Sequence, residues 1–294
     1  MANVKRRLAA NAPGPWFVDD TCIDCDASRQ CAPELFAELD GQSVVIRQPE
    51  AAAELAAAAR AMLACPTGSI GRSGEPPGEL DLDRLFPQEL EDGVHYCGYN
   101  ASSSYGANAF FAVRPEGNLL VDSPRFVRRL VRALEERGGL AHILLTHRDD
   151  VADAERFARH FAAEVWIHQD DAAAAPFARN RFAARTEIRP GLVALPVPGH
   201  TRGSAVFHLE DRFLFTGDSL HYSRTRGELG AFPSVCWYSW EEQTRSLAGL
   251  CDLRFEWVLA GHGDRHRASP EWMRASLERL VAAMKAGDPA IDAW

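Results

Sequence analysis

The feature that most constrains this chain is a set of four polar loops, each directly after an apolar, strand-like run. The first loop holds His147 and Asp149, and the later ones hold His200, Asp218 and His262, each next to a glycine. Strand ends that open into loops are where α/β folds place ligands and catalytic groups. A fold that brings the four loops together would assemble one metal-binding site from separate strands.

The composition indicates a globular chain and excludes several classes of function. The 294 residues can form one large domain or two, and 46% hydrophobic with 25% charged residues is an ordinary balance. The net charge of −9 argues against nucleic acid or an anionic membrane as a partner. No apolar run approaches the ~20 residues that span a bilayer, and no signal-peptide core follows the N-terminal basic residues. We therefore expect a cytoplasmic protein that acts on a small-molecule substrate.

Cysteines near the N-terminus indicate a second kind of metal centre. Cys22 and Cys25 form a Cys-x2-Cys pair, and Cys65 follows later in a Cys-Pro dipeptide. This pattern resembles a single-cluster bacterial ferredoxin, in which three cysteines at intervals of three and the Cys-Pro cysteine hold one iron–sulfur cluster. The third position, however, holds Ser28, whose hydroxyl is a poor substitute for the thiolate that such clusters need.

Two interpretations of this departure stay open. Cys31 lies one helical turn beyond Ser28 and could replace it as the fourth ligand of a rearranged cluster. Alternatively, the segment is a ferredoxin-like domain that has lost its cluster and serves only in packing. The seven cysteines are an odd number in a chain without an export signal, which favours thiols or metal ligands over a disulfide framework.

A stretch rich in proline, glycine and acidic residues separates the chain into two parts. It predicts a linker over residues 73–92, between an N-terminal domain over 1–72 and a second domain over 93–294. In the first domain we expect a short helix over residues 34–39. The second domain has two strand-rich halves with helices, which predicts two sheets packed face to face with helices outside.

The order of the polar loops resembles the metallo-β-lactamase fold over about residues 90–294. In that family an aspartate closes an early strand, matched here by Asp122, and a His-x-His-x-Asp-His loop follows a later strand. The positions that match the family's ligands by order along the chain are His147, Asp149, His200, Asp218 and His262. The resemblance implies a four-layer αββα sandwich, preceded by the small ferredoxin-like domain.

The hallmark loop of that family is only partly present. Asp149 stands in place of its second histidine, and its Asp-His pair falls on Val151 and Ala152, whose side chains cannot coordinate a metal. The flavodiiron branch also places a carboxylate at the second position, so Asp149 is compatible with binding. The resemblance therefore implies a single ion, zinc or iron, held mainly by His147, Asp149 and His200.

The resemblance further implies a hydrolase that uses a metal-bound hydroxide against an ester, thioester or lactam-type bond. Asp218 would add a ligand or orient the water, His262 would act as a ligand or proton carrier, and Asp149 would also serve catalysis. An aromatic and basic stretch just after Asp218 would wall the substrate pocket. Its candidate residues are Tyr222, Arg226, Trp237 and Tyr238.

Other interpretations stay open. Asp149 or Asp150 could simply begin the following helix, for which Asp153 is the natural N-cap. An iron-dependent oxidoreductase would pass electrons from a redox partner, through the N-terminal cluster, to iron in the second domain. A noncatalytic member of the fold would have lost both centres. Metal analysis separates these functions, because zinc alone favours hydrolysis and iron with labile sulfide favours redox chemistry.

Overall fold

The chain is seen in a computed structural model that describes residues 2–74, 80–288 and 291. It divides into an N-terminal unit, Met1–Asn118 with Ser123–Leu140, and a C-terminal unit, Leu119–Asp122 with Ala141–Trp294. Residues 75–79 of the predicted linker lie outside the described residues. The domain boundaries expected at residues 72 and 93 stay predictions.

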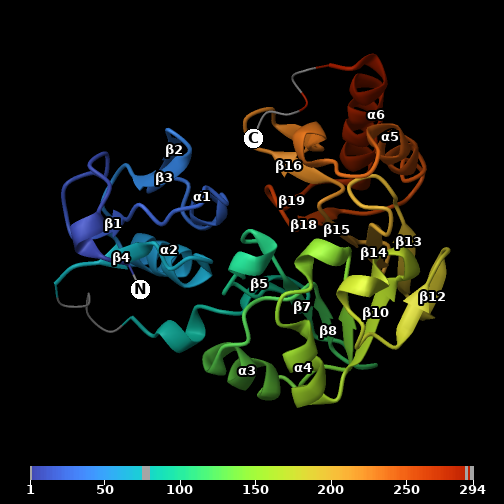
Figure 1. Cartoon of the computed structure of the whole chain (residues 1–294), viewed down its shortest axis with the longest axis horizontal. Coiled ribbons are helices and arrows are strands. Elements are labelled where there is room, and N and C mark those ends of the chain that lie inside the picture. The colour runs from blue at the N-terminus through green and yellow to red at the C-terminus, as the bar shows by residue number, and fades with distance from the viewer. Residues whose placement is uncertain (1, 75–79, 289–290, 292–294) are drawn as a thin grey trace. The chain divides into compact units, whose positions relative to one another are not determined.

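Two helices and two small antiparallel sheets form the part of the N-terminal unit that carries the cysteine motif (Figure 1). In chain order the elements are β1 (Trp16–Val18), α1 (Ala27–Cys31), β2 (Phe36–Leu39), β3 (Gln42–Val45), α2 (Ala52–Ala64) and β4 (Ile70–Arg72). β1 pairs with β4, and β2 pairs with β3. Buried side chains that include Trp16, Leu35 and Phe36 pack with the alanines of α2 into one apolar core.

The helix predicted over residues 34–39 is wrong, because most of that stretch is strand β2. Leu39 faces Gln42 across the ladder, so the hairpin turns through only two residues, Asp40 and Gly41. Both have positive φ, 53° and 75°, as a type I′ turn requires. Asp-Gly is a favoured pair for this turn, and the turn directs the chain into a hairpin.

Among its described residues, the rest of the N-terminal unit has three strands and one α-helix, besides short 3-10 helices. They are β5 (Gln88–Glu91), β6 (Val94–Tyr96), β7 (Phe110–Ala112) and α3 (Arg128–Glu135). The strands pair antiparallel in the order β5-β6-β7. The loop between β6 and β7 approaches the cysteine motif at Gly106, where a Cβ would lie 2.7 Å from Cys25 Cβ and 2.9 Å from its Sγ. Glycine is therefore required where this loop passes Cys25.

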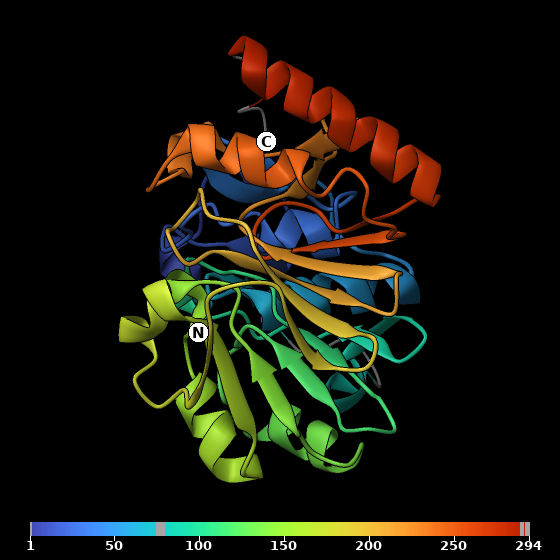
Figure 2. The same ribbon diagram turned by 90° about the vertical axis from the view of Figure 1, so that its right-hand side faces the viewer.

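The first sheet of the C-terminal unit is parallel. Its elements are β8 (Leu119–Val121), β9 (His142–Leu144), α4 (Ala154–Phe161), β10 (Glu164–His168) and β11 (Asn180–Phe182). The strands pair in the order β11-β10-β9-β8. Helix α4 connects β9 to β10 and lies on the outer side of this sheet, with Phe157 fully buried beneath it. Figure 2 shows this side of the unit.

The second sheet of the C-terminal unit is mixed and has the order β12-β13-β14-β15-β18-β19. Its strands are β12 (Thr186–Arg189), β13 (Leu192–Pro196), β14 (Ala205–Leu209), β15 (Phe213–Gly217), β18 (Trp257–Ala260) and β19 (His266–Arg267). A hairpin and two helices complete the unit: β16 (His221–Ser223), β17 (Glu228–Gly230), α5 (Trp240–Ala248) and α6 (Pro270–Ala286).

Alternate residues of β14 show how the layers stack. Val206 joins an apolar core with side chains of α5 and α6, which cover the outer face of the mixed sheet (Figure 2). The next residue, Phe207, points the other way and meets Phe182 of β11, with ring centroids 6.2 Å apart. Successive residues of a strand face opposite sides, so the mixed sheet is buried on both faces. The predicted four-layer αββα sandwich is confirmed.

Local signals set the bounds of the long helix α6. Ser269 accepts a hydrogen bond from the backbone N–H of Trp272 and Pro270 takes the first helical position, while Gly287 ends the helix with a φ of 68°. In the part of the chain that the structure describes, no helix is long and apolar enough to cross a membrane.

Candidate metal centres

The polar loops of the C-terminal unit meet because their strands run side by side. Asp122 follows β8 and His147 follows β9, and these two strands are parallel neighbours. Asp218 follows β15 and His262 follows β18, which are also parallel neighbours. His200 lies on the connection between β13 and β14. The carboxyl ends of parallel strands meet at one edge of a sheet, so each sheet delivers its ligand-bearing loops to one place.

Asp218 lies at the centre of this group of side chains. Its Oδ2 atom is 3.6 Å from both His147 Nε2 and His200 Nε2. His262 Nδ1 is 2.8 Å from Asp218 Oδ1 and 2.9 Å from Oδ2. Asp149 Oδ2 is 3.4 Å from His200 Nε2 and 3.9 Å from His147 Nε2. The structure thus brings together all five residues that the sequence singled out as ligands.

Four of these atoms fit one metal ion: His147 Nε2, His200 Nε2, Asp149 Oδ2 and Asp218 Oδ2. His147 and His200 are buried, and within the described residues their Nε2 atoms have no hydrogen-bond partner. A buried imidazole nitrogen without a hydrogen-bond partner is stabilised when it binds a cation or accepts a hydrogen bond. A tetrahedral ion with bonds of ~2.0 Å to nitrogen or oxygen holds its ligand atoms about 3.3 Å apart. The separations of 3.4 to 3.9 Å around Asp149 and Asp218 are close to that value.

Thr146 holds His147 in the orientation that a metal ligand needs. The Thr146 backbone N–H donates to Asp122 Oδ1 at 2.8 Å, and its hydroxyl donates to the same carboxylate at 2.9 and 3.0 Å. The hydroxyl oxygen lies 2.9 Å from His147 Nδ1. Because the hydroxyl donates its hydrogen bond to Asp122, its oxygen accepts one from the Nδ1–H of His147. The lone pair of His147 is then on Nε2, which faces Asp149 and Asp218.

Buried carboxylates and imidazoles set one another's charge in this centre. Burial lowers the pKa of His147, but Asp150 and Asp218 outweigh burial and raise it to about 10. Burial likewise lowers the pKa of His262, and Asp218 raises it to about 9. Burial raises the pKa of Asp218, yet the two imidazoles hold it well below its usual range. A metal ion competes with these protons, so its affinity should rise with pH.

Asp150 is a residue whose place in the centre the sequence did not reveal. It ends the 3-10 helix η4 (Arg148–Asp150) and is only 1% exposed. One ligand atom each from Asp150, His147 and Asp218 lie within 4.8 Å of one another. The sequence signal was a run of carboxylates in one loop. Burial alone distinguishes Asp150 from Asp153, which precedes α4 without a capping hydrogen bond from its side chain.

The predicted pocket residues Trp237 and Tyr238 lie beside His200. The backbone N–H of each donates to the His200 carbonyl, at 3.0 and 3.1 Å, and the Trp237 ring centroid is 6.3 Å from that of His200. The two residues are 60% and 43% exposed, which is high for large aromatic side chains. The guanidinium of Arg202 lies over the Tyr238 ring at 5.1 Å. An exposed aromatic surface therefore adjoins the centre.

The other two predicted pocket residues contact protein neighbours. Tyr222 stacks on His266 with ring centroids 3.9 Å apart, and the Arg226 guanidinium lies 3.9 Å from the Glu228 carboxylate. Both belong to the region of the β16–β17 hairpin. Their role in a substrate pocket stays a prediction.

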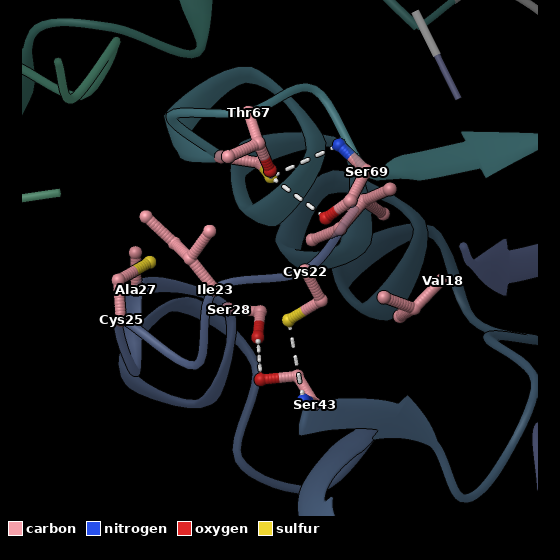
Figure 3. Close-up of a pocket in the computed structure, with 11 residues that line it drawn as sticks. Val18, Cys22, Ile23, Cys25, Ala27, Ser28, Ser43, Thr67 and Ser69 are labelled. Carbon is pink, nitrogen blue, oxygen red and sulfur yellow. Dashed lines mark hydrogen bonds between the residues drawn. The ribbon is translucent and has the colours of Figure 1, made fainter. Parts of the chain in front are cut away.

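In the N-terminal unit, three cysteines line one pocket, which Figure 3 shows in close-up. They are Cys22, Cys25 and Cys65, and Ser28 lines the pocket with them. Cys31 is not among the described residues of the lining and instead packs at the edge of the apolar core. The pocket therefore gathers the three cysteines that match the ferredoxin pattern, together with the serine that departs from it.

Backbone N–H groups already point at these sulfur atoms. Ser43 N–H donates to Cys22 Sγ and Ser69 N–H donates to Cys65 Sγ, each at 3.3 Å (Figure 3). Such bonds stabilise cluster-bound thiolates and tune their potential. Burial raises the pKa of the Cys25 thiol to about 12. The Ser28 hydroxyl donates to Ser43 Oγ at 3.0 Å. The pocket therefore offers three thiols as ligands for a cluster, with the Ser28 hydroxyl beside them.

Two protein families match this chain. Residues 18–72 match the "4Fe-4S single cluster domain of Ferredoxin I", which confirms the ferredoxin-like N-terminal domain. Residues 91–269 match the "Metallo-beta-lactamase superfamily". Among curated proteins, the chain is 26% identical to YobT, an uncharacterized protein of Bacillus subtilis, over 215 residues that cover 60% of this chain and 91% of YobT.

Solved structures with the same fold include TMB-1, DIM-1 metallo-beta-lactamase and a metallo-beta-lactamase from Hirschia baltica. TMB-1 is 15% identical, with a TM-score of 0.54 and coverage of 68% of this chain and 97% of TMB-1. DIM-1 is 14% identical, with a TM-score of 0.53 and coverage of 68% and 97%. The Hirschia baltica protein is 16% identical, with a TM-score of 0.50 and coverage of 67% and 96%. At these identities the likeness shows the fold alone.

Membership of this superfamily supports a metal-dependent hydrolase in general, and the fold is one that binds metal ions. The buried imidazoles and carboxylates of the C-terminal unit agree with that chemistry. Since the match over residues 91–269 spans more than half of the 294 residues and the fold agrees with it, the chain belongs to the metallo-β-lactamase superfamily.

Proposed function

We propose that this protein hydrolyses an ester, thioester or lactam-type bond in a small molecule, with one zinc or iron ion held tightly by His147, Asp149 and His200. The observation that carries the proposal is the convergence of ligand atoms from these residues and Asp218 at separations of 3.4 to 3.9 Å. Two of those atoms are buried imidazole nitrogens that no described protein group satisfies. Such a set of atoms suits a cation better than any other ligand.

Each surrounding residue has a task that follows from its position. The ion, when bound, supplies polarisation of the scissile carbonyl and acidification of a water molecule. Asp218 faces both imidazoles and completes the ligand set or orients the water. His262 bonds both oxygens of Asp218 and holds that carboxylate in place. The Asp149 side chain is 45% exposed, so it lies on the open side, where a substrate enters.

The exposed aromatic residues beside the centre support recognition of an apolar group on the substrate. Backbone hydrogen bonds hold Trp237 and Tyr238 next to His200, and the Trp237 ring centroid is 6.3 Å from that of His200. Rigid aromatic side chains bury a large apolar area at a low cost in side-chain entropy. We therefore expect a substrate with an apolar or aromatic group close to the bond that is cleaved.

The test compares His200→Ala with His160→Ala. His160 is an exposed histidine of α4, so its replacement removes an imidazole far from the predicted ligand set. His200→Ala should lose the bound metal and the hydrolysis of chromogenic aryl esters, thioesters and β-lactams together. His160→Ala should keep both. A His200→Ala protein that retains full metal content and full activity would refute the proposal.

A second candidate function rests on the cysteine pocket. Three thiols line that pocket, and residues 18–72 match a single-cluster ferredoxin family. A cluster there would pass electrons, received from a redox partner, to an iron ion in the C-terminal unit. Protein purified without oxygen would then contain labile sulfide, and iron in excess of that sulfide. Zinc without labile sulfide would instead favour the hydrolase alone, and neither metal would favour a noncatalytic member of the superfamily.

A further inference from the structure

Asp171 is a buried carboxylate that the proposed ligand set leaves unused. It lies in the 3-10 helix η5 (Gln169–Ala174), directly beyond β10, and is only 2% exposed. Burying an ionised carboxylate is unfavourable unless hydrogen bonds or a cation replace the water. Three protein groups donate hydrogen bonds to Asp171, and all three belong to the loops that carry the imidazoles of the candidate centre.

The first donor lies in the loop after β9. The backbone N–H of Arg148 donates to Asp171 Oδ2 at 3.0 Å. Arg148 stands between His147 and Asp149 and is the first residue of η4, where N–H groups lack a partner within the helix. Asp171 therefore supplies the missing acceptor, and it holds the start of the segment that carries two of the proposed ligands.

The other two donors lie in the loop between β13 and β14. The Thr201 hydroxyl donates to the same Oδ2 atom at 2.5 Å, and the Gly203 backbone N–H donates to Oδ1 at 3.2 Å. These residues follow His200 by one and three positions. A Cβ on Gly203 would lie 2.6 Å from Asp171 Cγ, so only glycine lets the loop pass this close. Asp171 thus holds the His200 loop at two points.

Ser204 fixes the direction of the hydrogen bond from Thr201. Ser204 Oγ accepts from the Thr201 backbone N–H at 2.9 Å and also lies 2.9 Å from Thr201 Oγ1. An ionised carboxylate can only accept, so the Thr201 hydroxyl donates to Asp171 and the Ser204 hydroxyl donates to Thr201. Hydrogen bonds to a charged acceptor are stronger than those between neutral groups. The buried network therefore ends at Asp171.

One carboxylate oxygen connects the two loops. Asp171 Oδ2 accepts from the residue after His147 and from the residue after His200. The Ala205 backbone N–H also donates to the Thr146 carbonyl at 2.8 Å, which joins the same segments at their strand ends. Asp171 adds a second link, directly beside the residues that carry the imidazoles.

We propose that Asp171 is a positioning residue of the candidate metal centre, whose carboxylate joins the His147 loop to the His200 loop and sets the separation of the two imidazoles before an ion binds. Both of its oxygens accept hydrogen bonds from these loops, so it acts on the centre through them. A centre held in place beforehand loses less conformational entropy when an ion binds, and its affinity is higher. The inference rests on the proposed function, which places an ion between the imidazoles.

The test compares Asp171→Asn with wild type in Zn²⁺ binding. Asparagine keeps the side-chain shape but replaces one acceptor oxygen by an NH2 group, so at least one of the three hydrogen bonds is lost whichever way the amide lies. Competition with a chromophoric chelator gives the dissociation constant of the Zn²⁺ site that His200→Ala removes from the full-length protein. In Asp171→Asn this constant should rise by about 10- to 100-fold.

Asp170→Asn is the matched control, because Asp170 is an exposed carboxylate of the same 3-10 helix. It should bind Zn²⁺ as wild type does. The free energy of unfolding of each protein is measured in EDTA. A merely structural role of Asp171 would lower this free energy in Asp171→Asn and leave the dissociation constant of the folded protein unchanged.

Amide exchange tests the same inference in wild type. In EDTA, peptides that contain residues 147–150 and 200–204 should already be protected, and Zn²⁺ should slow their exchange only slightly. In Asp171→Asn both peptides should exchange faster in EDTA and regain protection with Zn²⁺, while β13 and β14 exchange as in wild type. Unprotected loops in metal-free wild type would overturn the inference, whether or not the variant folds.

The Zn²⁺ titrations separate this inference from the proposed function. A wild-type protein without a Zn²⁺ site that depends on His200 overturns the proposed function and this inference together. If wild type has that site and Asp171→Asn binds Zn²⁺ with the same dissociation constant, the positioning role of Asp171 alone is overturned.

Discussion

Thr146 connects the early strand aspartate to the first imidazole of the centre. Its hydroxyl bonds both Asp122 oxygens and lies 2.9 Å from His147 Nδ1, and Gly217 passes so close that a Cβ there would be 2.4 Å from that hydroxyl. The sequence drew attention to Asp122 and His147 but not to the residue between them. A threonine just before a histidine is not by itself a motif, so only the structure shows its task.

Thr146→Val should weaken metal binding and preserve the fold. Valine has the shape of threonine but lacks the hydroxyl, so nothing holds Nδ1 of His147 or fixes its tautomer. We expect the metal dissociation constant to rise by about 10- to 100-fold, measured by competition with a chromophoric chelator. Thr146→Ser keeps the hydroxyl and should bind metal nearly as wild type does. Equal affinities for the valine and serine variants would remove this role from Thr146.

His221 should make the protein less stable in mild acid. It is 2% exposed, stacks on Phe232 with ring centroids 3.8 Å apart, and burial lowers its pKa to about 3. The unfolded chain takes up a proton on this imidazole near pH 6.5, whereas the folded chain stays neutral down to about pH 3. The contribution of neutral His221 to the free energy of unfolding is therefore fully present above about pH 6.5, and it is lost as the pH falls toward 3.

His221→Phe should flatten this dependence, because phenylalanine keeps the stacked ring and cannot be protonated. Between pH 6.5 and 5 the variant should lose roughly 1.6 kcal/mol less unfolding free energy than wild type, because the slope is half of ~1.4 kcal/mol per pH unit at pH 6.5 and approaches the full value by pH 5. Denaturant unfolding in EDTA at several pH values measures the difference. His160→Phe, at an exposed position, should behave as wild type. Parallel curves for His221→Phe and wild type would show that His221 is protonated in the folded state.

At the scale of the elements, the residues of one turn explain why the helix predicted over residues 34–39 is wrong. The stretch 34–39 has a helical spacing of apolar residues, yet Asp40 and Gly41 form a two-residue turn that commits it to the β2–β3 hairpin. The hairpin carries Ser43, whose backbone N–H reaches Cys22 Sγ and whose hydroxyl accepts from Ser28. The turn therefore positions part of the cysteine pocket.

Gly41→Val should loosen this hairpin. Gly41 has a φ of 75°, and a β-branched side chain in that region costs about 1–2 kcal/mol, although a Cβ there would meet no other atom. We expect faster amide exchange in β2 and β3, measured by mass spectrometry, and little change in the C-terminal unit. Asp40→Asn is the control, because asparagine also adopts positive φ readily. Unchanged exchange in Gly41→Val would mean that the strands, and not the turn, set the register.

At the scale of the whole molecule, the chain combines two kinds of metal-ligand chemistry. The N-terminal unit offers thiols with backbone N–H groups aimed at sulfur, and the C-terminal unit offers imidazoles and carboxylates. Soft thiolates favour iron–sulfur clusters, whereas the nitrogen and oxygen set favours zinc, iron or manganese. The two centres should therefore be lost separately.

Cys22→Ser should lower the labile sulfide and the visible charge-transfer absorption of anaerobically purified protein, and leave the metal of the C-terminal unit in place. His200→Ala should do the reverse. Elemental analysis with a sulfide assay measures both in one sample. The two variants act on different units and serve as controls for each other. If either substitution removes both centres, the centres are not chemically separate.

The sequence by itself determined the ligand types and their order. Histidines and aspartates directly after apolar runs indicated strand ends, and parallel strands bring such ends to one edge, so the convergence of His147, His200, Asp218 and His262 could be anticipated. The ferredoxin-like domain was equally visible, because a Cys-x2-Cys pair with a distant Cys-Pro is a specific pattern. Both depend on residue identity and spacing along the chain.

Only the tertiary structure decided which side chains face inward. Asp149, Asp150 and Asp153 lie within five positions of one loop, and every one of them could have capped a helix. The folded chain turns Asp149 toward His200, buries Asp150 beside Asp218 and leaves Asp153 ahead of α4. The close passage of Gly261, which is more than 100 residues away in sequence, makes room for that burial. Side-chain direction in a loop depends on packing between distant strands, which local sequence does not encode.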